Sequence, residues 1–210
     1  MEEIVKAYEA ATSNEVELSF GQSEELLPQI KVGREGDVFV SHDPYPDQVK
    51  AADALGRSVQ VGFVAPVLVV RKGNPKGVAS LDDLARDGVS VALPSPEYST
   101  CGEMLKALME RKGLWEKALK NADGAVFRSH SETANALKLG TRDAGVMWNG
   151  TAHEFLDALE IVPTPYEYDG TVRVLVMGLS YSSKPQAVDA FLDFCESKAT
   201  DVFTEFGYVK

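Results

Sequence analysis

The stretch LSFGQSEELLPQI at residues 18–30, followed by GDVFVSHD at 36–43, decides the fold that the sequence predicts. Alternating apolar residues predict a strand over 16–20, and Ser23, with two glutamates behind it, predicts the N-cap of a helix. A further strand is predicted over 37–41. A helix that opens directly after a strand presents unpaired backbone N–H groups, which bind anions. The stretch therefore predicts an α/β protein with an anion site where strand meets helix.

The same arrangement recurs at three later positions. Thr100, Ser129 and Thr151 are each followed three residues later by glutamate, which is the pattern of a capping box. Every helix needs a start, and serine or threonine caps helices that bind nothing. Repetition of the pattern favours oxyanion binding but does not by itself identify a ligand.

Strands and helices alternate along the rest of the chain. Strands are predicted at 59–70, 89–93, 126–128, 144–147, 159–162 and 171–179. Helices are predicted at 23–32, 47–55, 80–86, 101–112, 132–139, 151–158 and 185–206, after a helical pattern that begins at the first residue without a cap. Such alternation is typical of an α/β fold with largely parallel sheets. Pro28 removes one early hydrogen bond of its helix, which predicts a tightened first turn.

Composition excludes several classes of function. The net charge of −11 argues against nucleic acid and against anionic membrane surfaces as partners. No apolar run is long enough to span a bilayer, and no signal peptide pattern follows Met1. There is no phosphate-binding glycine loop, and His42, His130 and His153 have no metal-ligand spacing.

Cysteine chemistry is the only candidate for catalysis. Cys101 lies at a predicted helix start, where a thiolate is favoured, and His130 is a conceivable base, but nothing in the sequence brings the two together. Cys101 and Cys195 are expected to be free thiols; a disulfide in an oxidising compartment is the alternative. Trp115 and Trp148 are typical core residues, although Trp148 follows a strand end, where α/β sheets bind ligands.

Five segments of the chain resemble one known family. They are LSFGQSEELLPQI, GDVFVSHD, LPSPEYSTCGEMLKALMERKGLWEKAL, ETANALKLGTRDAGVMWNGTA and the closing FTEFGYVK. In order and spacing they are similar to the periplasmic molybdate-binding proteins of ABC importers, over essentially all 210 residues. The resemblance implies the two-domain type 2 periplasmic-binding-protein fold, with mixed, mostly parallel sheets flanked by helices and two crossing strands. It divides the chain into domain I, residues 1–69 and 174–210, and domain II, residues 70–173.

The resemblance also implies a set of ligand-binding residues. Ser23 corresponds to a hydroxyl donor, and Cys101 takes the place of a small residue whose backbone N–H binds the anion. Thr133 matches a backbone N–H donor at a helix start, and Trp148 stands where the family usually has a ligand-binding tyrosine. No catalytic residue is implied, and no metal site other than the metal oxyanion itself.

Three features depart from the family pattern. The family's first strand and its serine loop would lie before Met1. Trp148 replaces a hydroxyl with a single indole N–H on a larger ring, and His42 stands where a small residue is typical. These departures bear on which anion is bound.

The sequence therefore predicts a monomeric, non-enzymatic solute-binding protein without a cofactor. Its ligand is expected to be molybdate or tungstate, bound in an interdomain cleft through N–H and hydroxyl donors, and its partners the permease subunits of an ABC importer. The family implies a periplasmic or lipid-anchored extracellular location. The alternatives are a binding protein for another anion, a cytosolic oxyanion sensor, which the missing signal peptide favours, and an enzyme that uses Cys101.

Overall fold

The computed structural model describes residues 1–164, 168 and 172–209, and it forms two compact units. Unit 1 comprises Met1–Val64 and Val172–Lys210, and unit 2 comprises Ala65–Thr171. Thr171, the predicted start of a strand, and Lys210, the end of the last family segment, lie outside the described residues, as do 165–167 and 169–170 of the predicted domain II. The domain limits at 69/70 and 173/174 stay a prediction.

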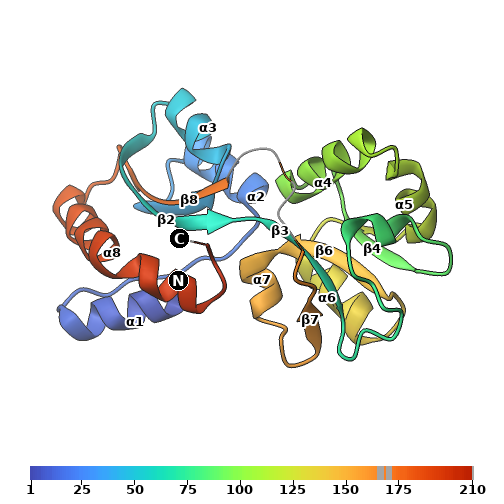
Figure 1. The fold of residues 1–210 in the computed structure, drawn as a ribbon. Coiled ribbons are helices and arrows are strands. Elements are labelled where there is room, and N and C mark those ends of the chain that lie inside the picture. Colours follow the sequence, from blue (N-terminus) through green and yellow to red (C-terminus); the bar gives the residue numbers. More distant parts are fainter. Residues whose placement is uncertain (165–167, 169–171, 210) are drawn as a thin grey trace. The chain divides into compact units, whose positions relative to one another are not determined.

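Unit 1 is a three-stranded sheet with helices (Figure 1). Its elements are α1 (Glu2–Ala11), α2 (Ser23–Pro28), the π-helical turn η1 (Gln29–Gly33), β1 (Val38–His42), α3 (Tyr45–Ala51), β2 (Leu55–Val64), β8 (Val172–Leu179) and α8 (Pro185–Glu205). The strand order is β1-β8-β2, and β8 is antiparallel to both neighbours. The long helix α8 packs on α1, where the rings of Tyr8 and Phe191 meet edge to face at 5.0 Å.

The predicted strand over 16–20 is wrong. Residues 12–22 form no strand, and Phe20 is 69% exposed. A strand needs a neighbour for its hydrogen bonds, whereas Val16 N donates to Glu9 Oε1 at 2.8 Å. The segment is an extended connection between α1 and α2.

The effect of Pro28 is the reverse of the tightening that the sequence predicts. α2 ends at Pro28, and the π-helical turn η1 follows it. The backbone N–H of Arg34 donates to Gln29 O at the end of this turn, and Arg34 has a left-handed φ of 52°. Proline is disfavoured inside an α-helix because it donates no backbone hydrogen bond, and here the α-helix ends at Pro28 and the π-helical turn follows it.

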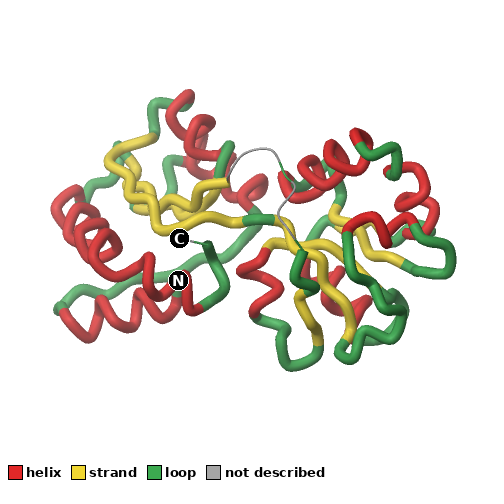
Figure 2. Tube along the Cα trace, in the orientation of Figure 1, coloured by secondary structure: helices red, strands yellow, loops and turns green. Residues whose placement is uncertain are grey.

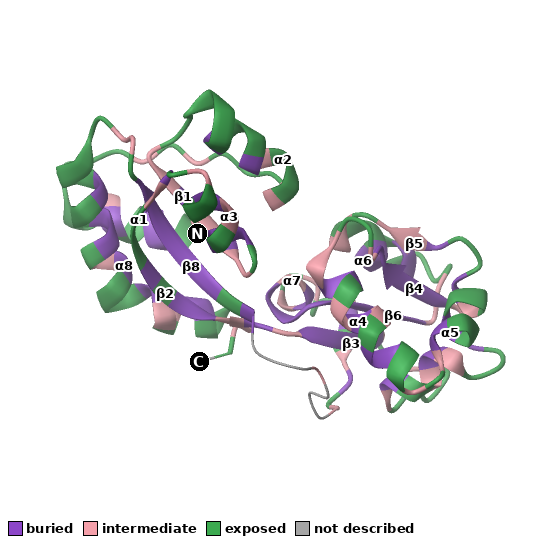
Figure 3. Ribbon diagram, turned by 90° about the horizontal axis from the view of Figure 1, so that it is seen from above, coloured by how far each residue is buried: buried purple, intermediate pink, exposed green. Residues whose placement is uncertain are grey.

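Unit 2 is a five-stranded sheet with helices (Figure 2). Its elements are β3 (Pro66–Arg71), the 3₁₀ helix η2 (Leu81–Ala85), β4 (Val91–Pro94), α4 (Thr100–Arg111), α5 (Trp115–Ala122), β5 (Val126–Phe127), α6 (His130–Lys138), β6 (Ala144–Trp148), α7 (Asn149–His153) and β7 (Leu159–Ile161). The strand order is β5-β4-β6-β3-β7, and its central strands are buried (Figure 3). No described helix is long and apolar enough to cross a membrane.

The predicted mixed α/β class is confirmed, but its strand directions are not largely parallel. Among the described strands, the parallel pairs are β4 with β5 and β4 with β6. In unit 2, β3 is antiparallel to β6 and β7; in unit 1, β8 returns from far along the chain to lie between β1 and β2. Alternation along the chain predicts parallel neighbours only where consecutive strands are also adjacent in the sheet.

The apolar run over 59–70, predicted as one strand, is two strands in different sheets. β2 ends at Val64 in unit 1, and β3 begins at Pro66 in unit 2. Pro66 has no N–H to donate, so it is tolerated at the first position of a strand but not in the middle. The chain therefore passes from one unit to the other at Ala65.

Candidate functional site

Three strands of unit 2 end at one edge of its sheet, and a helix follows each. Because β4 is parallel to β5 and β6, Pro94, Phe127 and Trp148 end their strands at this edge, and α4, α6 and α7 begin beyond them. β3 is antiparallel to β6, with Pro66 opposite Trp148, so β3 begins there as well. Ligands of open α/β sheets bind beyond the carboxyl ends of parallel strands.

At the start of α4 the cap lies one residue earlier than predicted. Ser99, not Thr100, is the N-cap: its backbone is extended, its carbonyl accepts from Glu103 N at 2.9 Å, and its hydroxyl accepts from Gly102 N at 3.5 Å. Within the described residues the Cys101 N–H forms no hydrogen bond. This amide is the predicted anion donor, and α4 is 12 residues long, so its dipole favours an anion there.

The predicted thiolate at Cys101 is wrong. Cys101 is fully buried, and burial raises the pKa of its thiol well above the usual value. A helix dipole is worth about 0.3–1 kcal/mol, less than one pKa unit, whereas full burial shifts a pKa by up to about 3–5 units. The effect of burial on the thiol pKa therefore exceeds that of the helix dipole, and the thiol is neutral at physiological pH.

Both cysteines are free and buried, which predicts slow alkylation of the folded protein. Burial also raises the pKa of Cys195 to about 11. We expect iodoacetamide at pH 8 to modify neither thiol on the time scale on which it modifies the unfolded chain. Mass spectrometry of native and denatured samples measures the two rates. Rapid labelling of Cys101 in the folded protein would contradict the buried position.

The capping box at the start of α6 is confirmed. Ser129 Oγ accepts from Glu132 N at 3.3 Å, and Glu132 Oε2 accepts from Ser129 N at 3.0 Å. Thr133 follows in the first turn, fully buried, and its amide donates to Ser129 O at 3.4 Å. A Cβ at Gly145 would lie 2.8 Å from Thr133 Cγ2, so this methyl packs closely on β6. Thr133 thus has a packing role, and its role as an anion donor stays a prediction.

Trp148 ends β6 and is buried, with 8% of its surface exposed. Its ring meets that of His130 edge to face, at 6.2 Å between centroids, so the end of β6 and the start of α6 lie together. Trp148 also occupies the N-cap position of α7, and Thr151 lies inside that helix. The capping box predicted at Thr151 is therefore wrong.

Asn149 lies at the same edge of the sheet, and the sequence interpretation missed its structural role. It is 3% exposed, its Oδ1 accepts from Ala65 N at 3.1 Å, and its own N–H donates to Ala65 O at 3.0 Å. These two bonds hold the residue at which the chain enters unit 2 against the start of α7. An asparagine directly after an apolar strand was the available signal, because an amide in such a place is expected to be buried and buried amides need partners.

Ser23 lies in unit 1, at the start of α2, and its hydroxyl does not cap the helix. Gln22 occupies the N-cap position, without a side-chain hydrogen bond. Ser23 Oγ instead lies 2.7 Å from Ser41 Oγ of β1, and Ser41 is 6% exposed. Each hydroxyl carries one hydrogen, and the contact uses one of the two, so the pair retains an O–H for another acceptor. The sequence interpretation missed Ser41.

The residues next in sequence to Ser23 and Ser41 form hydrogen bonds and ring contacts with other polar and aromatic side chains. Tyr45 OH donates to Glu24 Oε1, and the His42 ring lies edge to face with Tyr45 at 5.4 Å. Burial lowers the pKa of His42, which favours its neutral form. Asp43 accepts two hydrogen bonds from the Arg173 guanidinium, at 2.8 and 2.9 Å, and this pairing lowers the pKa of Asp43.

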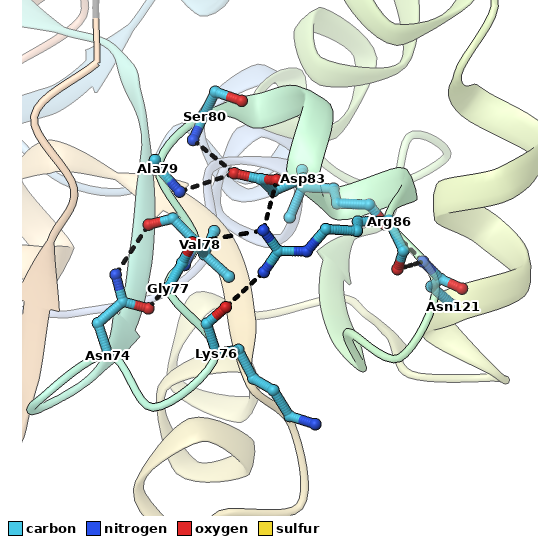
Figure 4. Close-up of polar contacts among 10 residues, drawn as sticks. Asn74, Lys76, Gly77, Val78, Ala79, Ser80, Asp83, Arg86 and Asn121 are labelled. Atoms are coloured by element: carbon cyan, nitrogen blue, oxygen red, sulfur yellow. Dashed lines mark hydrogen bonds and ion pairs between the residues drawn. The ribbon is translucent and has the colours of Figure 1, made fainter.

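A polar network at the opposite edge of the unit 2 sheet, after β3, is structural rather than a binding site (Figure 4). Asp83 Oδ2 accepts from Ala79 N and Ser80 N, and Asp83 Oδ1 accepts from Arg86. Arg86 also donates to the carbonyls of Gly77 and Lys76. These charged groups therefore stabilise the segment between β3 and β4 through hydrogen bonds within that segment. The described residues contain no cluster of three or more histidine, cysteine or acidic side chains that could hold a metal ion.

Comparison with known proteins places the chain in a family. A family model described as bacterial extracellular solute-binding protein matches residues 1–209. The chain belongs to this family. Its members bind solutes and are not enzymes, so the proposal of a Cys101 enzyme is not supported.

Individual relatives differ in the solutes named for them. The molybdate-binding protein ModA of Mycobacterium tuberculosis is 27% identical over 199 residues, which are 93% of this chain and 74% of ModA. The sulfate-binding protein SubI of the same species has a TM-score of 0.76 at 19% identity, covering 98% of this chain and 80% of SubI. The structure of L-phospholactate-bound PEB3 has a TM-score of 0.77 at 17% identity, and the match covers 100% of this chain and 94% of PEB3. The similarities to SubI and PEB3 establish a shared fold and do not identify the ligand of this chain.

Proposed function

We propose that this protein is the oxyanion-binding component of an ABC importer of the molybdate type. The observation that carries the proposal is the likeness to ModA over 93% of the chain. The donors available within each unit suit such a ligand: a serine pair with an O–H to donate in unit 1, and the Cys101 amide at the start of α4 in unit 2. Neutral donors bind a dianion in spite of the net charge of −11, because they act at hydrogen-bond distance.

In this proposal both units contribute donors to one anion. Ser23, with Ser41 behind it, donates from unit 1, and Cys101, Thr133 and Trp148 contribute from unit 2. The units close over the anion, and the loaded protein, a monomer, docks on membrane permease subunits. Selectivity for molybdate or tungstate over sulfate follows from cavity size and the number of donors. The family suggests a periplasmic or extracellular location.

Calorimetric titration tests the ligand directly. We expect molybdate and tungstate to bind more tightly than sulfate. Tighter binding of sulfate, or of an organic phosphate such as L-phospholactate, would favour the alternative of another anion, to which SubI, PEB3 and the bulky Trp148 point. Binding of none of them would remove the transport proposal and the alternative of an oxyanion sensor together.

Ser23→Ala is expected to weaken molybdate binding by about 10- to 150-fold. A hydrogen bond to a charged group contributes about 1.5–3 kcal/mol, and the substitution removes the donor. Because Ser23 does not cap α2, the cost to folding is limited to its bond with Ser41, about 0.5–1.5 kcal/mol. Calorimetry and chemical denaturation measure the two effects separately.

Ser197→Ala is the matched control. Ser197 lies on α8 of the same unit and is exposed, and among the described residues its hydroxyl donates to Phe194 O of its own helix. We expect it to leave molybdate affinity unchanged. Equal affinities of the wild type and Ser23→Ala would exclude Ser23 from the site.

A further inference from the structure

Unit 2 contains a pocket between α4, α5 and β5, lined in part by the residues that directly follow β4 and β5 and by none of Cys101, Thr133 and Trp148. Its volume is about 420 Å³, within the range of small-molecule sites in proteins. It is lined by Ser95, Pro96, Glu97, Tyr98, Lys106, Trp115, Leu119, Val126 and Arg128.

The apolar part of this pocket has surface left to bury. Trp115 and Val126 belong to its lining, and Trp115 is only 7% exposed. Tyr98 and Leu119 are 42% and 38% exposed, among the large apolar side chains that the folded chain leaves open to water. A ligand with an apolar body would cover them, and burial of apolar surface is favourable.

The polar part of the pocket is cationic. The guanidinium of Arg128 lies over the Tyr98 ring, at 4.0 Å from its centroid. Among the described residues no carboxylate pairs with Arg128 and no acceptor takes its N–H groups. In the part of the chain that the structure describes, Lys106 pairs with Glu110 alone, at 3.7 Å. Glu97 is the acidic residue of the lining.

Arg128 differs in this respect from the arginines that hold the fold of unit 2 together. Arg86 donates to Asp83 and to two carbonyls, and Arg142 donates to the carbonyls of Ala122 and Thr141. Stacking on an aromatic ring occupies the face of a guanidinium but leaves its edge free to hold a carboxylate with two parallel hydrogen bonds. Arg128 thus has unused capacity to bind a carboxylate.

We propose that this pocket is a second ligand site, which binds a small organic carboxylate with an aromatic or short aliphatic body. The carboxylate pairs with Arg128, with Lys106 as the second cation. The body lies on Trp115 between Tyr98 and Leu119. The site belongs to unit 2 alone and does not depend on the oxyanion that the protein carries.

The probe for the test is 4-fluorobenzoate, observed by fluorine NMR on the full chain, with the neutral 4-fluorobenzamide as its matched analogue. We expect saturable binding of the carboxylate and none of the amide at the same concentrations. Arg128→Gln should weaken binding of 4-fluorobenzoate by about ten-fold or more, because charged hydrogen bonds are lost. The affinity of Arg128→Lys should lie between those of the wild type and Arg128→Gln. Leu119→Glu, at an exposed position, should abolish binding by placing a negative charge against the ligand.

Lys72→Gln is the control for charge. Lys72 is exposed and follows β3, at the other edge of the same sheet, and its removal should leave the affinity unchanged. Equal binding of amide and carboxylate, an unaffected Arg128→Gln variant or the absence of saturable binding would each overturn the proposal. Molybdate calorimetry on the same preparation separates this failure from a failure of the transport function, because the two ligands use different residues.

Discussion

Molybdate at about 100 times its dissociation constant is expected to raise the melting temperature by about 5–11 °C. A ligand that binds only the folded state at this concentration adds about 2.7 kcal/mol of stability. For a chain of about 150–250 residues, each kcal/mol corresponds to about 2–4 °C. Tungstate should give a similar shift, and sulfate at the same concentration a smaller one. Differential scanning calorimetry measures the shifts.

The shift must follow the logarithm of ligand concentration, because linkage is a mass-action effect. Sodium chloride at equal ionic strength is the control, since screening alone acts on surface charges without saturation. Ser23→Ala should reduce the shift at a fixed molybdate concentration, and Ser197→Ala should not. A melting temperature that no oxyanion changes at millimolar concentration would contradict oxyanion binding by this chain.

Gly102→Ala is expected to destabilise the protein by about 3 kcal/mol or more. A Cβ at this position would clash with Ser95 O and would lie 2.7 Å from Pro94 O. These atoms belong to the backbone, which cannot turn aside like a flexible side chain, so the start of α4 must move away from the end of β4. Overpacking costs about 1–3 kcal/mol, and a clash with buried backbone lies at or beyond the upper end. Urea denaturation of the variant measures the loss.

The matched control is Gly73→Ala. Gly73 has a φ of +80°, but nothing lies within 4 Å of a Cβ placed there. Its cost is limited to the left-handed conformation, about 1–2 kcal/mol. If Gly102→Ala were no more destabilising than Gly73→Ala, the close contact between α4 and β4 would not exist in solution. In the proposed function, Gly102→Ala also displaces the neighbouring Cys101 amide, so a folded fraction should bind molybdate more weakly.

Local signals in the sequence predicted several elements well. The final helix, predicted at 185–206, is found at Pro185–Glu205, because proline at the first turn and regularly spaced apolar residues act within one element. The capping box at Ser129 was also predicted correctly, since both of its partners lie in one turn. The helix α5, Trp115–Ala122, was missed as an element.

Candidate site residues were harder to place, because their roles depend on neighbours distant in the sequence. The partner of Ser23 is Ser41, 18 residues away, and the partner of Asn149 is Ala65, 84 residues away. Cys101 was expected to be reactive from its place at a helix start, whereas its burial depends on packing that the local pattern does not contain. Resemblance to a family pointed to Ser23, Cys101, Thr133 and Trp148, but not to the contacts that each makes.

The sequence by itself determined the α/β class, most helices and strands, and the solute-binding family, because periodicity, capping and family motifs are properties of short segments. Only the tertiary structure decided which strands are neighbours, that the run 59–70 divides at Ala65, and that segment 16–20 is not a strand. It also decided that the Cys101 thiol is neutral and that the Arg128 guanidinium stacks on Tyr98. Strand pairing, desolvation and stacking are made by groups brought together from separate parts of the chain, and no local pattern of residues determines them.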